Sequence, residues 1–447
     1  MTKDLTAGNP AKLICMFSIP LLIGNLFQQF YSMVDTAIVG RFVGVNALAA
    51  VGATGSMSFL IVDFVIGLTA GFAIPIAQTF GANDKDKMRH YVAMSIYLSI
   101  ALSIVVTILA VCFAKPLLEL MNTPVDIIDD AYTYIVIIFA GLCTTVLYNM
   151  VAGVLRSIGD SKTPLYFLIL SAILNVILDL VFILKFQMGV AGAAYATVIS
   201  QGISGVLCLF YAIKRYKILH LTTEDFHYQS GSIYKLLRLG FPMALQYSIT
   251  AIGIMVLQSA VNSLGSTVVA AYTAASKVEQ LALQPFKTLG ITMATYTGQN
   301  LGAGKMERIK KGVTSGMVIC TICCIISGLM IFFLGDALVG LFITPSPESV
   351  AVIETSREYL IAVVPFLIPV GAIFIYRNSL QGLGEGLITL IAGMIELVSR
   401  CIVALFFTST LGYTAIYLAT QAAWLSAGVF LVIVYYVKMK KGRFISC

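Results

Sequence analysis

Five carboxylates lie inside long apolar segments of this chain, where an ionised side chain needs a reason to be present. They are Asp35, Asp63, Asp179, Glu279 and Glu396. A carboxylate at the centre of a membrane-spanning helix costs about 2.5 to 3.5 kcal/mol on insertion scales, so it either binds a partner or carries a function. Three basic residues share these segments: Lys277, Lys287 and Arg400. The positions of these charges therefore indicate where the chemistry of the protein lies.

Two of the carboxylates share one depth in the membrane. Asp35 lies about five residues before the outer end of its apolar segment and Asp179 about six, or roughly 7 and 9 Å at 1.5 Å per residue. Asn175 lies one turn from Asp179 on the same helix face, and Thr197 lies roughly 12 Å into the next segment. Oxygen ligands from three helices therefore meet in one layer.

This layer has the composition of an ion-coupling site. Two close carboxylates in a medium of low dielectric constant cannot both stay ionised without help, so the pair should hold a proton or a cation such as Na⁺. We therefore predict a coupling site for H⁺ or Na⁺ formed by Asp35, Asn175, Asp179 and Thr197. The alternative is that each aspartate caps a helix break or bonds a neighbouring backbone group.

A second group of charges lies in the second half of the chain. Glu396 and Arg400, at i and i+4 near the middle of one segment, are consistent with an internal ion pair or with a role in gating or substrate binding. Lys277 and Glu279 are two residues apart and point in different directions on a helix. Each therefore needs a partner on another helix, and a cavity in the second half is one candidate location.

The composition identifies the solvent of these segments. Of 447 residues, 59% are hydrophobic and only 11% are charged, with a mean hydropathy of +0.94, whereas a soluble domain is roughly a quarter charged. Apolar runs of 20 or more residues recur along the chain without the alternation that barrel strands require. We therefore expect an all-α polytopic membrane protein and exclude an ordinary soluble enzyme.

The apolar runs between polar breaks predict twelve spanning helices. They fall at about 13–39, 46–76, 91–113, 131–155, 164–184, 190–212, 236–262, 267–297, 313–335, 356–376, 386–408 and 412–437.

Lysine and arginine are distributed unequally between the two sides of this arrangement. With the N-terminus inside, the inside loops and tails hold 21 of the 28 basic residues. The outside loops hold Arg41, Lys115, Lys185 and Arg357. This bias places both termini in the cytoplasm of a cell-membrane protein. Asp63 and Lys287 then fall toward the cytoplasmic ends of their helices, where contacts with loops or with the interface are expected.

The two halves of the chain resemble each other. Residues 49–82 align with 270–303 at an ungapped shift of 221, with nine identities in 34 positions. The motif QTFGA, beginning at Gln78, reappears as QNLGA, beginning at Gln299, and a shift of 225 applies farther along. Such self-similarity indicates an internal duplication.

Each repeat holds six helices, so both enter the membrane with the same polarity. We predict an N-terminal six-helix lobe over residues 1–213, a cytoplasmic linker over 214–238 and a C-terminal six-helix lobe over 239–447. Two parallel bundles with a site between or inside them are typical of a secondary transporter that works by alternating access.

Other classes of function fit the residues poorly. The net charge of +7 comes from basic residues scattered between apolar runs, so no nucleic-acid partner is expected. The nine cysteines lack the spacing of a metal site, and most of them lie in apolar runs. An intramembrane enzyme would need a metal cluster or a nucleophile with a base inside the bilayer, whereas His90, His220 and His227 fall in loops or at a segment end. We expect no enzymatic activity and no cofactor.

Several motifs, in order along nearly the whole chain, resemble one known family. They are VDTAIVG from Val34, QTFGA from Gln78, LRSIGDSKTP from Leu155, NVILD from Asn175, GAAYATVIS from Gly192 and GQNLGAGK from Gly298. In this order they resemble the multidrug and toxic compound extrusion (MATE) family, within the multidrug, oligosaccharidyl-lipid and polysaccharide flippase superfamily. The resemblance implies a V-shaped pair of lobes that exports organic cations and other amphipaths in exchange for H⁺ or Na⁺. It also implies a first-lobe cation site on the residues matching Asp35, Asn175, Asp179 and Thr197.

One departure from the family pattern matters for coupling. Some branches carry a carboxylate on the seventh helix and another on the tenth, whereas here the seventh helix offers only Gln246 and Gln258 and the tenth has no acid. Coupling is therefore expected through the first lobe. The expected partners are the bilayer and small amphipathic or cationic substrates, and we expect a monomer.

One alternative within transport is a flippase or exporter of a lipid-linked or other amphipathic metabolite. A lipid-linked sugar would need several basic residues in the cavity to hold its pyrophosphate. The candidates are Lys277, Lys287 and Arg400. This small number favours the efflux transporter.

Overall fold

The chain folds almost entirely into helices. The computed structural model describes residues 4–121, 123–343 and 349–442. The first half contains α1 (Pro10–Phe42), α2 (Val45–Ala53), α3 (Gly55–Gly81), α4 (Lys85–Leu120), α5 (Ile128–Ala140), α6 (Leu142–Ser157), α7 (Lys162–Leu180) and α8 (Gly189–Arg215). The second half contains α9 (Ser230–Asn262), α10 (Ser266–Gly302), α11 (Met306–Gly340), α12 (Ser349–Val363), α13 (Leu367–Gly382), α14 (Gly386–Leu411) and α15 (Tyr413–Lys441).

These helices confirm the prediction of twelve spans. Ten continuous helical segments of the described chain are long and apolar enough to cross a bilayer, and α5 with α6 forms a further span bent by 44°. The twelfth is α10, whose 37 residues include Lys277, Glu279 and Lys287 and are too polar to be found by hydropathy. Most helices run a few residues beyond the apolar runs, as in α4, which begins at Lys85 and ends at Leu120.

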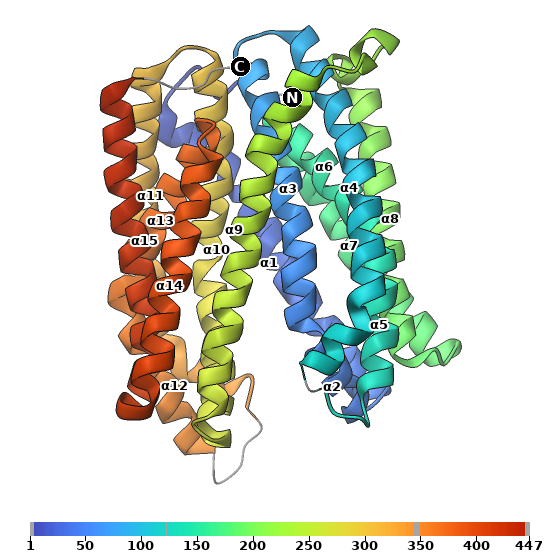
Figure 1. The fold of residues 1–447 in the computed structure, drawn as a ribbon, viewed down its shortest axis with the longest axis vertical. Helices are drawn as coiled ribbons and strands as arrows, with labels where there is room; N and C mark the ends of the chain where they lie inside the picture. The colour runs from blue at the N-terminus through green and yellow to red at the C-terminus, as the bar shows by residue number, and fades with distance from the viewer. Residues whose placement is uncertain (1–3, 122, 344–348, 443–447) are drawn as a thin grey trace.

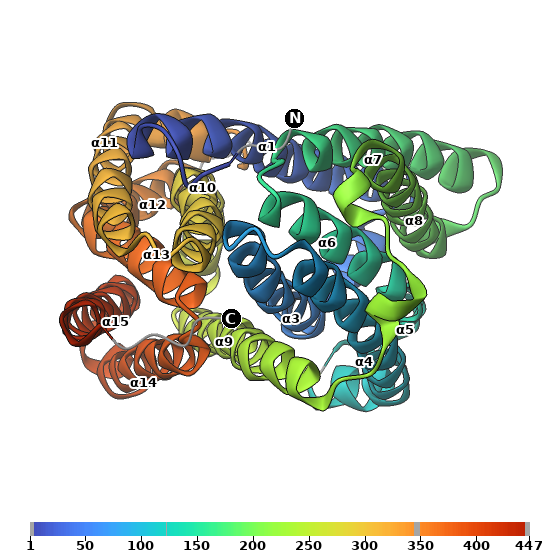
Figure 2. The same cartoon turned by 90° about the horizontal axis from the view of Figure 1, so that it is seen from above.

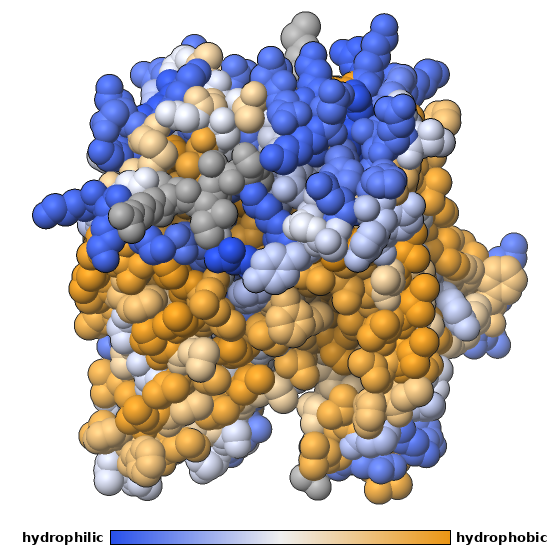
Figure 3. Space-filling model, turned by 45° about the horizontal axis from the view of Figure 1, so that its top comes forward, coloured by the Kyte–Doolittle hydropathy of each residue, from blue (hydrophilic) through white to orange (hydrophobic). Residues whose placement is uncertain are grey.

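The spans form two bundles with the V-shaped arrangement that the resemblance implies. Figure 1 shows α2 to α8 on one side and α10 to α15 on the other, with both ends of the described chain at the top. In the space-filling view, apolar side chains cover the flanks and a notch separates the two bundles at the lower edge (Figure 3). The upper end carries the segments rich in lysine and arginine, such as 85–89 and 305–311, and is called the basic end below. The notched end is called the open end.

The first helix of each half packs against the other half. Helix α1 contacts α10 and α11 as well as α7, and Figure 2 shows it along one side of the molecule between the two bundles. Helix α9 packs along α3 and along α14. The α3–α9 crossing is close because Gly67 and Gly71 of α3 form a small-xxx-small pair. A Cβ added at Gly71 would lie 2.4 Å from the Cα of Gly240.

The repeated QxxGA motifs meet at the basic end and close it. A Cβ on Gly81 would lie 1.9 Å from the carbonyl oxygen of Gln299, and a Cβ on Gly302 would lie 1.8 Å from that of Gln78. The Gln78 amide donates to the Gly382 carbonyl at 2.9 Å, and the Gln299 amide donates to the Ser157 carbonyl at 2.8 Å. This set of reciprocal contacts, here called the basic-end crossing, joins the two halves.

The segment before α1 strengthens this closure. The Leu5 side chain is fully buried, and its N–H donates to the Gln299 side chain at 3.0 Å. The Leu5 carbonyl accepts from Asn300 and from Arg308, both at 3.2 Å. The Lys305 ammonium donates to the Thr6 carbonyl at 2.9 Å. An N-terminal segment of the first half is thus anchored to the second half.

Candidate substrate cavity and ion-coupling site

A cavity of about 430 Å³ lies mainly among helices of the first half. Its walls come chiefly from α1, α3, α6, α7 and α8, with a few residues from α5, α9, α10 and α13. Apolar side chains such as Leu21, Leu168 and Ile291 line part of it. A volume in this range accommodates a drug-sized molecule.

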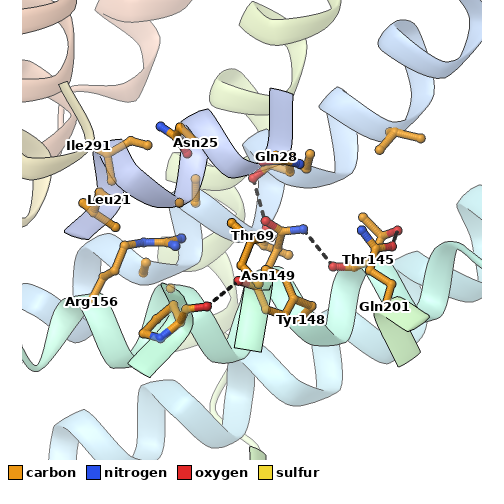
Figure 4. A pocket seen from close by; sticks show the side chains of 18 of the residues that line it. Leu21, Asn25, Gln28, Thr69, Thr145, Tyr148, Asn149, Arg156, Gln201 and Ile291 are labelled. Carbon is orange, nitrogen blue, oxygen red and sulfur yellow. Dashed lines mark hydrogen bonds between the residues drawn. The ribbon is translucent and has the colours of Figure 1, made fainter. Parts of the chain in front are cut away.

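A row of polar groups on α6 and α8 faces this cavity (Figure 4). The Thr145 hydroxyl donates to the Gln201 side chain at 2.7 Å, and the Asn149 amide donates to the Thr145 carbonyl at 2.9 Å. The Tyr148 hydroxyl donates to the Pro164 carbonyl at 2.9 Å. A few fixed polar groups on an otherwise apolar wall are typical of a site that orients amphipathic ligands.

The four residues of the predicted coupling layer come together beside this cavity, toward the open end. Asp35 comes from α1, Asn175 and Asp179 from α7, and Thr197 from α8. Asp179 and Asn175 are buried, with 0% and 1% exposure, whereas Asp35 and Thr197 are half-buried. The carboxyl groups of Asp35 and Asp179 lie within hydrogen-bonding reach of each other. Thr197 also lines the cavity and joins the two sites.

Asn175 connects the pair to Thr197. In one orientation of its amide, Asn175 donates to the Thr197 hydroxyl at 3.3 Å. In the flipped orientation it donates to Asp179 Oδ2 and accepts from the Thr197 N–H and hydroxyl, each at 3.3 Å, which satisfies both ends of the amide. The flipped orientation therefore gives Asp179 a hydrogen-bond donor and pairs both ends of the Asn175 amide.

One buried oxygen of each carboxyl group has no donor among the described residues, so a hydrogen bond between the two groups needs a proton on one of them. Asp35 Oδ1 and Asp179 Oδ1 are both buried and unpaired among the described residues. Tyr31 of α1 and Tyr134 of α5 lie within electrostatic range of both carboxyl groups and also line the cavity. Unpaired buried oxygens beside two further oxygen ligands form a donor set that suits a proton or a hard cation.

Four charged residues of the second half, Glu279, Arg377, Glu396 and Arg400, have internal partners instead. Glu396 Oε2 accepts from Arg377 at 2.8 Å, and its Oε1 accepts from Arg400 at 3.4 Å. All three side chains are less than a tenth exposed. Of the alternatives that the sequence left open for Glu396 and Arg400, the structure therefore contains the internal ion pair and adds a second arginine to it.

Glu279 and Lys277 differ from each other. Glu279 accepts a hydrogen bond from the Tyr359 hydroxyl of α12 at 2.8 Å, which provides the partner on another helix that the spacing requires. Lys277 is exposed. Neither residue lines the cavity described above.

The expectation that Asp63 and Lys287 make contacts at the cytoplasmic ends of their helices is wrong. Asp63 lies eight residues from Gly55, the start of α3 at the open end, or about 12 Å inside it. Lys287 lies about 22 Å from the end of α10 at the basic end. Each side chain is within electrostatic range of the other across the two halves, and Glu279 is also near Lys287.

Two arginines, the half-buried Arg156 and the buried Arg377, fall just beyond the predicted spans that end at residues 155 and 376, and their placement in cytoplasmic loops is wrong. Arg156 lies in the last turn of α6 and lines the cavity, and Arg377 lies inside α13. The helices continue to turns at Gly159 and Gly384, which have φ angles of 85° and 87° and occupy matching repeat positions. Glycine favours such a turn after a helix, so these glycines could have located both helix ends.

The comparison with known proteins agrees with this architecture. The family model MatE matches residues 20–181 and 242–406, one segment in each half. The chain belongs to the MATE family. A probable multidrug resistance protein, YpnP of Bacillus subtilis, is 31% identical over 88% of this chain and 87% of its own length. A FAD transporter of Shewanella oneidensis is 24% identical over 87% of this chain and 85% of its own.

A solved structure shows the same arrangement as this MATE protein. The outward-facing conformation of a multidrug resistance MATE family transporter matches with a TM-score of 0.92 and 25% identity, covering 98% of both chains. The protein is therefore a multi-pass, all-α membrane protein of a transporter family, with two repeats of six helices.

Proposed function

We propose that this MATE protein exports amphipathic small molecules by alternating access in exchange for H⁺ or Na⁺. The observation that carries the proposal is the placement of two carboxyl groups with unpaired buried oxygens beside a ligand-sized cavity. The names of its relatives, a multidrug resistance protein and a FAD transporter, support a small-molecule substrate without fixing its charge.

The coupling ion would bind at Asp35, Asn175, Asp179 and Thr197. A proton could be shared between the two carboxyl groups, and Na⁺ could take oxygen ligands from all four side chains. Thr197 contacts this layer and also lines the cavity, so it would couple ion binding to substrate binding. Linkage between the two ligands is reciprocal, so an ion that weakens substrate binding is itself displaced by the substrate.

Electrostatics gives this linkage its sign. A cationic group of the substrate near the ionised Asp35 and Asp179 is attracted to them, and neutralisation of the pair by an ion removes that attraction. Binding of the ion from the open end would therefore lower substrate affinity and favour release on that side. The organic cations that the family resemblance implies would be exported in this way.

Alternating access would require the basic-end crossing to separate. In the present conformation Gln78, Gln299 and the segment around Leu5 join the two halves at that end. Loading of substrate from the basic end needs these contacts to break while the open end closes. The reciprocal pairing of repeated motifs supports this element as the closed gate.

We further propose the topology and assembly predicted from the sequence. Both termini would face the cytoplasm at the basic end, with residues 214–238 linking the lobes over 1–213 and 239–447. The linker contains two short 3-10 helices and contacts α4 through the Arg89–Asp225 ion pair. The protein would act in the cell membrane as a monomer.

The flippase alternative gains one basic residue from the structure. Arg156 is the one charged side chain among the described residues that line the cavity. A pyrophosphate group would need several such residues. The cavity therefore supports an exporter of small amphipaths over a flippase for lipid-linked sugars.

Reconstituted vesicles provide the test. Efflux of the fluorescent amphipath rhodamine B would be measured with a Na⁺ gradient alone, a pH gradient alone and neither gradient. The proposal expects one of the two gradients to accelerate efflux. Equal rates under all three conditions would exclude ion-coupled export.

A further inference from the structure

The charge of the cavity is opposite to that expected for a site dedicated to cations. Its described lining contains one charged side chain, Arg156, and no carboxylate. Asp35, Asp63 and Asp179 lie behind the walls and do not line it. In Figure 4 the Arg156 side chain extends from α6 into the space bordered by Leu21 and Thr69.

Arg156 has no partner among the described residues. It takes part in none of their hydrogen bonds or ion pairs, in contrast with Arg377 and Arg400, which share Glu396. The nearest acid along the chain, Asp160, is already occupied. Its Oδ1 accepts from the backbone N–H groups of residues 162 and 163, and its Oδ2 accepts from the Tyr216 hydroxyl at 2.6 Å.

The groups around Arg156 cannot replace an anion. Tyr148, Tyr247 and Cys208 are the titratable side chains that act on Arg156 electrostatically, and the Tyr148 hydroxyl donates to the Pro164 carbonyl. A guanidinium keeps its positive charge in proteins, so it cannot escape the cost of partial burial by losing a proton. An unpaired guanidinium that faces a cavity is therefore complementary to an anionic ligand group.

We propose that Arg156 binds the anionic group, a carboxylate, phosphate or sulfonate, of an amphipathic substrate. The inference rests on the proposed function, because it assigns the substrate class of that same cavity. The apolar body of the substrate lies against side chains such as Leu21, Leu168 and Ile291.

Arg156, which lines the cavity, and the carboxylate layer beside the cavity lie toward opposite ends of the first bundle, and this separation of charge would orient the substrate. Arg156 is near the basic end, in the last turn of α6 and six residues before the start of α7, whereas Asp179 is near the other end of α7. The 17 steps along α7 from Lys162 to Asp179 span about 25 Å. A substrate can therefore place its acidic group at Arg156 and a cationic or neutral end toward the carboxylate layer, so the ion linkage described above is preserved.

The test compares two probes that differ by one charge. Rhodamine B carries a free carboxylate, and in its ethyl ester that carboxylate is masked. Fluorescence anisotropy with the purified full-length protein in phosphatidylcholine nanodiscs gives both affinities. We expect rhodamine B to bind about tenfold or more tightly than the ester, as for a charge-assisted hydrogen bond. The substitution Arg156→Gln should remove this preference, and Arg156→Lys should retain part of it.

The controls separate a loss of recognition from a loss of folding. The ratio of the two affinities is measured on one sample and does not depend on the fraction that is folded. Arg41→Gln removes an exposed charge at the end of α1 and should leave the ratio unchanged. Arg156→Glu should reverse the preference toward the ester. A wild-type protein that prefers the ester, or an Arg156→Gln variant with the wild-type ratio, would overturn the proposal.

The source of the anion is distinguished by the lipid. If a lipid headgroup occupies Arg156, phosphatidylglycerol nanodiscs should suppress rhodamine B binding to the wild type far more than to Arg156→Gln. If the ligand is a soluble amphipath, the lipid should affect both proteins equally. The rhodamine B preference of the wild type and its loss in Arg156→Gln establish the anion at Arg156, and the lipid comparison then identifies its source. Because binding is measured without an ion gradient, failure of coupled export would leave this result standing and would count against the proposed function alone.

Discussion

The two halves of this transporter share a fold but treat their buried charges differently. In the first half, Asp35 and Asp179 keep unpaired oxygens beside a cavity, and Arg156 faces the same cavity without a partner. In the second half, Glu396 binds two arginines and Glu279 accepts a hydrogen bond from a tyrosine. Duplication thus preserved the helical frame while the chemistry of the two copies diverged.

This difference separates exchangeable charges from structural charges. A buried carboxylate with fixed partners gains nothing from a mobile ion, whereas one with an unpaired oxygen can bind and release it. Under the proposed function, ion exchange would take place in the first half, and Glu279 and Glu396 of the second half would have a structural role. Matched substitutions in the two halves can break this assignment.

The largest effect is expected from Glu396→Gln. The substitution leaves Arg377 and Arg400 buried without a counter-charge, which should cost about 3–5 kcal/mol of stability. Thermal unfolding in detergent measures it. The control Glu307→Gln removes an exposed carboxylate that pairs with Lys310 and should unfold close to wild type. Equal unfolding temperatures for the two variants would show that the Glu396 network is not structural.

A smaller loss is expected where the two repeats touch. In Gly302→Ala the new Cβ would lie 1.8 Å from the Gln78 carbonyl oxygen, so the backbones must move apart at a cost of about 1–3 kcal/mol. Gly340→Ala, at a helix position with no atom within 4 Å of the added Cβ, is the matched control. Unfolding temperatures of the two variants give the comparison. Indifference to Gly302→Ala would contradict a tight basic-end crossing.

The hydrogen bonds of Asp225, in the linker between the halves, should contribute about 1 kcal/mol to the free energy of unfolding. Burial alone would raise the pKa of Asp225, but the hydrogen bonds from Thr222 and the charge of Arg89 outweigh it and hold that pKa below its ordinary value. Because this pKa is lower in the folded state, the ionised carboxylate stabilises the fold at pH values above its unfolded pKa of about 3.9. This stabilisation is lost as the pH falls through the folded pKa. Thermal unfolding of wild type and Asp225→Asn should therefore differ from pH 7 to about pH 5 and converge in stronger acid. A difference in unfolding temperature that persists in stronger acid would exclude this link between the ionisation of Asp225 and stability.

The smallest effect on stability is expected from Asp179→Asn in the first half. This substitution removes a buried carboxylate that already has an unpaired oxygen, so the unfolding temperature should be no lower than that of wild type. A loss as large as that of Glu396→Gln would place Asp179 among the structural charges and would remove the contrast between the halves.

The sequence was sufficient for the frame and for the carboxylate layer. Helix rise placed Asp35, Asn175, Asp179 and Thr197 at one depth, and the structure brings their side chains together. The depth of a residue in the membrane does not say toward which neighbouring helix its side chain points. The contact of Glu396 with Arg377 on another helix could therefore not be predicted. Arg156 was missed for a physical reason: an apolar run ends at its first charge, whereas the helix continues to the turn at Gly159, shielded from lipid by neighbouring helices.

Ion-driven efflux by the Asp179→Asn variant tests the central claim most directly. Rhodamine B efflux from vesicles would be compared with and without the ion gradient that drives wild type, using Asp336→Asn, which alters an exposed acid, as the control. The account predicts that Asp336→Asn keeps the wild-type acceleration and that Asp179→Asn shows none, although it still folds and binds rhodamine B. An unchanged dependence of Asp179→Asn on the gradient would contradict coupling at Asp35 and Asp179.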